Sequence, residues 1–67
     1  MTTHQYLAAL KALELTTNRM AAEATGLSIR QHQRIAHGEA TVPNTVAKLL
    51  HLALEVEGIS GAELASL

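Results

Sequence analysis

Apolar residues recur three or four positions apart near the start of this chain, the spacing of one helix face. They predict a helix over 3–14, and the residues of its apolar face are Tyr6, Leu7, Leu10 and Leu13. Thr2 is followed three residues later by Gln5, which is the spacing of a capping box, so the start of this helix is marked as well.

A second helix is predicted to follow after a short link. Thr16 is expected to cap it, and Met20, Ala21 and Ala24 are expected to face the interior. Ala22 is also small. Small side chains allow two helix axes to approach closely, so we expect this helix to cross its successor at a short distance.

A tight turn is predicted between the second and third helices. Gly26 can adopt the left-handed conformation that ends a helix over 17–25. Ser28 can cap a helix over 28–37 by accepting from backbone N–H groups, and Gly38 closes that helix. The turn is therefore specified by local sequence.

A fourth helix is predicted over 44–56, because the residue before Pro43 is excluded from the helical region. Its apolar positions are Val46, Leu49, Leu50, Ala53 and Leu54. Ser60 and Glu63 form a second capping-box pattern and favour a short fifth helix over 61–66. The expected fold class is all-α, a compact bundle of four to five helices, and 67 residues suit one domain spanning 1–67.

Long polar side chains form a stripe on the predicted third helix. Arg30, Gln33, Arg34 and His37 recur at i, i+3, i+4 and i+7, so they project from one side of the helix. Arginine pairs with guanine and glutamine with adenine in the major groove of DNA. The alternative is an ordinary solvated surface, which the stripe taken alone would favour.

The stretch from Asn18 to Gly38 resembles the helix-turn-helix of the Cro and phage-repressor type, also called Xre-like. The likeness rests on a small residue (Ala22), glycine four residues later, an apolar residue and serine, and a second apolar anchor at Ile35. It implies a repressor-like bundle whose third helix enters the major groove, with base-reading positions at Ile29, Arg30, Gln33 and Arg34.

Phosphate contacts are implied at the margins of that helix. The resemblance assigns them to Thr17, Asn18, Arg19 and His37, and the start of the fourth helix adds Asn44, Thr45 and Lys48. Taken singly, each of these residues fits an ordinary cap or surface residue better, and it is their joint placement that favours phosphate contacts.

His32 departs from the family, which usually has a branched apolar residue there. We expect a partly buried ring that fills this anchor position and hydrogen-bonds a nearby carbonyl. A pH-sensitive role is the alternative. A neutral, enclosed ring would have a lowered pKa, so acid would destabilise the fold.

Charge is separated along the chain. Residues 1–48 carry five basic and three acidic side chains, whereas residues 49–67 carry three glutamates and no lysine or arginine. The formal net charge is -1, which argues against a general polycation and suits a site-specific binder. One tyrosine and no Phe or Trp leave no stacking platform for single strands.

Several classes of function are disfavoured. Cysteine is absent, and His4, His32, His37 and His51 show no zinc-binding spacing, so no metal, cofactor or small-molecule ligand is expected. No nucleophile with its base is evident, so we expect no enzyme. There is no apolar run of membrane-spanning length and no leader pattern, so a cytoplasmic protein is expected.

The sequence thus favours a transcriptional regulator that binds double-stranded DNA, such as a repressor or an antitoxin-like autoregulator, acting as a homodimer. Apolar residues left over near the C-terminus are the expected dimer surface, namely Leu52, Val56, Ile59, Leu64 and Leu67. The alternative is a protein-interaction module on a helix-turn-helix scaffold that does not bind DNA. The operator is not specified by the sequence.

Overall fold

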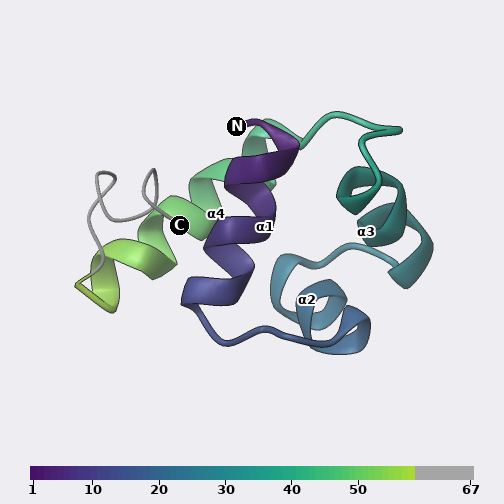
Figure 1. Ribbon diagram of the computed structural model, residues 1–67. Helices are drawn as coiled ribbons and strands as arrows, with labels where there is room; N and C mark the ends of the chain where they lie inside the picture. Colours follow the sequence, from purple (N-terminus) through teal and green to yellow (C-terminus); the bar gives the residue numbers. More distant parts are fainter. Residues whose placement is uncertain (59–67) are drawn as a thin grey trace.

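A computed structural model describes residues 1–58, which form four α-helices and no strand (Figure 1). In chain order these are α1 (Thr3–Ala12), α2 (Asn18–Thr25), α3 (Ile29–Ala36) and α4 (Asn44–Val56). The all-α prediction is confirmed for this part of the chain. The predicted helix over 61–66 lies outside the described residues.

Helix α1 begins at the predicted capping box. The Thr2 hydroxyl accepts from the Gln5 backbone N–H at 3.1 Å, and the Gln5 side-chain oxygen accepts from the Thr2 N–H at 2.9 Å. The helix ends earlier than residue 14, because Glu14 adopts a left-handed conformation (φ 59°). The N–H of Leu15 then bonds to the Leu10 carbonyl at 2.8 Å, which satisfies a carbonyl at the helix end.

Helices α2 and α3 are joined by the turn that the sequence predicts. Gly26 has a left-handed backbone (φ 75°), and Ser28 caps α3 in a capping box with Gln31. The cap of α2 is Thr17 rather than Thr16, since the Thr17 hydroxyl accepts from the Met20 N–H at 3.1 Å. The helices predicted over 17–25 and 28–37 are therefore slightly shorter in the structure, because Thr17, Ser28 and His37 are capping residues just outside them.

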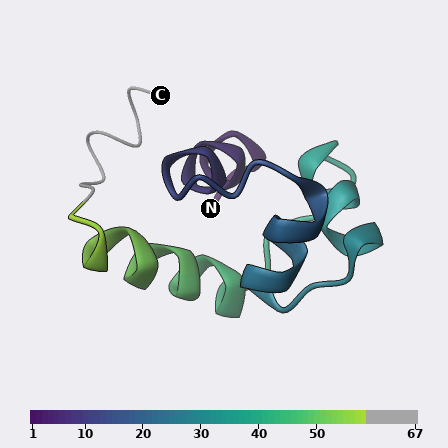
Figure 2. The same cartoon turned by 90° about the horizontal axis from the view of Figure 1, so that it is seen from below.

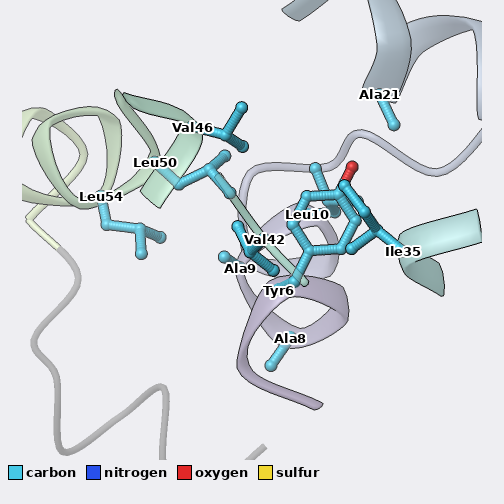
Figure 3. Packing of buried hydrophobic residues seen from close by; sticks show 10 residues of the cluster. All are labelled: Tyr6, Ala8, Ala9, Leu10, Ala21, Ile35, Val42, Val46, Leu50 and Leu54. Carbon is cyan, nitrogen blue, oxygen red and sulfur yellow. The ribbon is translucent and has the colours of Figure 1, made fainter. Parts of the chain in front are cut away.

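Helix α1 packs against α3 and α4, and α2 packs against α3 and α4 (Figures 1 and 2). Their buried faces meet in one apolar cluster (Figure 3). Its members are Tyr6, Ala8, Ala9, Leu10, Ala21, Ile35, Val42, Val46, Leu50 and Leu54. Tyr6 and Leu50 are its largest fully buried side chains, and both lie where α1 faces its neighbours.

Four apolar residues that were predicted to face inward are exposed instead. Leu7, Met20 and Leu49 are each about two-fifths exposed, and Ala24 also lies on the surface. Residues 6–10 are apolar throughout, so the pattern cannot distinguish Leu7 from the buried Ala8 and Ala9. Helix packing makes that choice, because small side chains let α1 approach its neighbours closely.

Candidate nucleic-acid interface

The outer face of α3 carries the polar stripe. Arg30, Gln33, Arg34 and His37 are all exposed, while His32 and Ile35 on the opposite face are buried. The capping box at Ser28 sets where this helix starts, and therefore which residues face outward. The predicted exposure of the stripe is confirmed, and Ile29 at its start is also about half exposed.

The candidate phosphate-contacting residues at the start of α2 are exposed and individually constrained. Thr17 is held by its capping bond, and the side-chain amide oxygen of Asn18 bonds to His32. Arg19 pairs with Glu23 one turn later at 3.2 Å, with both side chains largely exposed. Such a surface pair contributes only about 0–1 kcal/mol, so the Arg19 guanidinium can exchange this partner for another anion at little cost.

The start of α4 lies close to the C-terminal half of α3. Arg34 of α3 and Pro43, which directly precedes α4, line one small hollow of about 140 Å³. Asn44, Thr45 and Lys48 follow Pro43 on α4 and are exposed. Pro43 thus lies beside Arg34, and the roles of the three residues that follow it on α4 stay predictions.

A chain of hydrogen bonds lies beneath this surface and joins three helices. The Tyr6 hydroxyl of α1 lies 2.7 Å from His32 Nδ1 of α3, and His32 Nε2 lies 3.1 Å from Asn18 Oδ1 of α2. His32 is only 4 % exposed and Tyr6 is fully buried. The expected burial of His32 is confirmed, but its partners are a phenol and a side-chain amide located 26 and 14 residues away.

The bonding atoms determine the tautomer of His32. Asn18 Oδ1 can only accept, so Nε2 carries the proton and donates to it. In the neutral ring Nδ1 is then an acceptor, and the Tyr6 hydroxyl donates to it. Burial favours the neutral ring by lowering the pKa of His32, and with its proton on Nε2 that ring has both nitrogens satisfied. Figure 3 shows the Tyr6 hydroxyl oxygen at the side of the cluster where Ala21 and Ile35 lie.

Stability should decrease in acid because of His32. Burial lowers the pKa of His32, and the nearby His37 lowers it further. Between the folded pKa and the unfolded pKa of about 6.5, the unfolded chain binds a proton that the folded chain does not. The contribution of the neutral His32 to the free energy of unfolding is thus complete above about pH 6.5. It falls as the pH drops through that value towards the folded pKa.

Urea unfolding at pH 7.5 and pH 5.0 measures this effect, with a lower midpoint expected at pH 5.0. His32→Gln is the matched control, because it removes the titrating ring and should reduce the difference between the two midpoints. An unchanged midpoint in the native protein would contradict a buried neutral His32.

Exposed apolar side chains form a stripe on α4. Leu52 is 61 % exposed and Val56 is 84 % exposed, as the predicted dimer surface requires. Leu49 lies three positions before Leu52 and extends the same exposed stripe, so its predicted place in the core is wrong. The other three predicted dimer residues, Ile59, Leu64 and Leu67, lie outside the described residues.

Within residues 1–58, no three His, Asp or Glu side chains are grouped so that they could hold a metal ion. No helix in the same range is both long and apolar enough to span a membrane. Comparison with protein-family models, with curated proteins and with solved structures found no match to this chain.

Proposed function

We propose that the chain is a transcriptional regulator that binds double-stranded DNA site-specifically through a helix-turn-helix made of α2 and α3. The observation that carries the proposal is the exposed stripe Arg30, Gln33 and Arg34 on α3, opposite the buried His32 and Ile35. These side chains have the reach and the donors that base edges in the major groove require.

The surroundings of the stripe support the same assignment. Cations and short polar side chains flank α3 at the starts of α2 and α4, and they would meet the phosphates on either side of the groove. Phosphate contacts position the helix, and contacts to base edges give the specificity. Arg30 and Lys48 are thus expected to play different parts.

Arg30→Ala and Lys48→Ala separate these two parts. Losing one bidentate arginine pair should cost about 1–3 kcal/mol, and Arg30→Ala should relax the base preference at one position. Lys48→Ala should weaken binding to all sequences alike and lower the log–log salt slope by about 0.9. Sites selected from random duplex DNA with each variant measure the preference. Equal base preference in Arg30→Ala and the native protein would contradict the assignment.

A two-fold dimer is part of the proposal, since a single small module contacts few base pairs. The exposed stripe Leu49, Leu52 and Val56 would form its surface, and the half-sites would lie about 34 Å apart. Sedimentation at micromolar concentration should show a dimer that Leu52→Glu dissociates. A monomer that still binds a palindromic duplex tightly would contradict this arrangement.

The same apolar stripe also favours a second candidate function, docking of another protein by a scaffold that does not bind DNA. The net charge of -1 is compatible with it. Salt dependence discriminates between the two, because binding to DNA weakens steeply as salt rises and apolar docking does not.

A further inference from the structure

We propose that His32 is a positioning residue for DNA binding: it acts through Asn18 and turns the amide N–H2 of Asn18 outward, towards a phosphate. The inference rests on the proposed function, and it assigns to His32 and Tyr6 a part in binding although neither is exposed enough to touch DNA.

The first step is the direction of the bond between His32 and Asn18. Nε2 donates to Asn18 Oδ1 at 3.1 Å, so the amide oxygen of Asn18 is directed towards the interior. The amide nitrogen is on the other side of the same planar group. Because Asn18 is exposed, its N–H2 donors are presented to solvent at the first residue of α2.

The second step is the role of Tyr6. Its hydroxyl lies 2.7 Å from Nδ1 and donates to it when the ring proton is on Nε2. With the opposite tautomer, Nε2 would be an acceptor, and the Asn18 amide would turn its nitrogen inward to donate to it. The Tyr6 hydroxyl thus satisfies Nδ1 in the tautomer that turns the Asn18 N–H2 outward.

The third step is the chemistry of the outer position. The first backbone N–H groups of a helix and a side-chain N–H2 beside them both donate, which suits a phosphate oxygen. An oriented amide binds better than a freely rotating one, because less side-chain freedom is lost on binding. Removing His32 should therefore cost affinity even though the Asn18 side chain remains.

A double-mutant cycle tests the inference, with titration of a labelled duplex that carries the selected site. Asn18→Ala should weaken binding about tenfold or more, the range of one hydrogen bond to a charged group, and His32→Leu about two- to tenfold, the cost of ordering one freely rotating side chain. The variant carrying both changes should bind no more weakly than Asn18→Ala alone, since His32 acts only through Asn18. The salt slope should stay unchanged, because the amide is neutral.

His32→Gln is the matched conservative variant. Its side-chain N–H2 can donate to Asn18 Oδ1, so it should restore binding to within about twofold of the native protein, where His32→Leu does not. If the role of His32 were purely structural, the variant carrying both Asn18→Ala and His32→Leu would lose affinity by the product of the two single losses. Multiplied losses, or no rescue by glutamine, would overturn the inference.

The ring nitrogens of the native protein provide a measurement that needs no variant and no DNA. At pH 7.5 their NMR shifts should report a proton on Nε2 and none on Nδ1, and a proton on Nδ1 would overturn the inference. If the native protein binds no duplex, the proposed function fails and the inference fails with it. If it binds specifically and only the cycle disagrees, the inference alone fails.

Discussion

Leu50→Ala is expected to lower the free energy of unfolding by about 2–5 kcal/mol, the usual cost of emptying a leucine site in a packed interior. Leu50 is 2 % exposed and lies on α4 within the central apolar cluster, where α4 faces α1. A single core of this size rarely supplies more than about 3–5 kcal/mol in total. The variant should therefore be largely unfolded at 37 °C, which circular dichroism and urea unfolding would measure.

Leu52→Ala is the matched control for Leu50→Ala. It removes the same atoms from the same helix, two residues later, but the Leu52 side chain is 61 % exposed. Its free energy of unfolding should change by no more than about 0.5 kcal/mol, provided that both variants are measured at a concentration where the chain is monomeric. Equal losses for the two variants would mean that α4 packs through a different face.

Ala21→Leu is expected to destabilise the fold by about 1–3 kcal/mol, through overpacking rather than through a cavity. Ala21 is 1 % exposed and belongs to the cluster that includes Tyr6 and Ile35 (Figure 3). A larger side chain there must push α2 away from the helices that it packs against, α3 above all. We expect both a lower melting temperature and weaker binding to the selected duplex, because the spacing of α2 and α3 would change.

Ala24→Leu is the control on the same helix. Ala24 is exposed, so the added methyl groups should extend into solvent and leave the melting temperature nearly unchanged. A destabilisation equal to that of Ala21→Leu would contradict the packing of α2. The pair is informative because periodicity alone had placed both alanines in the interior.

The described helices could be predicted closely because their ends depend on residues only a few positions apart. Capping boxes form between Thr2 and Gln5 and between Ser28 and Gln31. Each joins residues three positions apart, so any helix starting there would make the same bonds. The left-handed conformation at Gly26 follows equally from its residue type. The exception is Glu14, whose left-handed conformation ends α1 early although glutamate gives no such signal.

The candidate interface could be predicted in part. Exposure of Arg30, Gln33 and Arg34 follows from helical spacing once Ser28 marks the start of α3. The binding roles of these residues stay predictions. The hydrogen-bond chain from Tyr6 through His32 to Asn18 could not be found from spacing, because its partners come from three different helices.

The sequence by itself therefore determined where α2 ends, where α3 and α4 begin and end to within their capping residues, and which side of α3 is polar, since these features depend on contacts within about one helical turn. Only the tertiary structure decided that Ala9 rather than Leu7 is buried, that Leu49 joins an exposed stripe, and which atoms satisfy the His32 ring. Those outcomes depend on how α1 approaches α3 and α4, and contacts between distant segments leave no periodic signal in the chain.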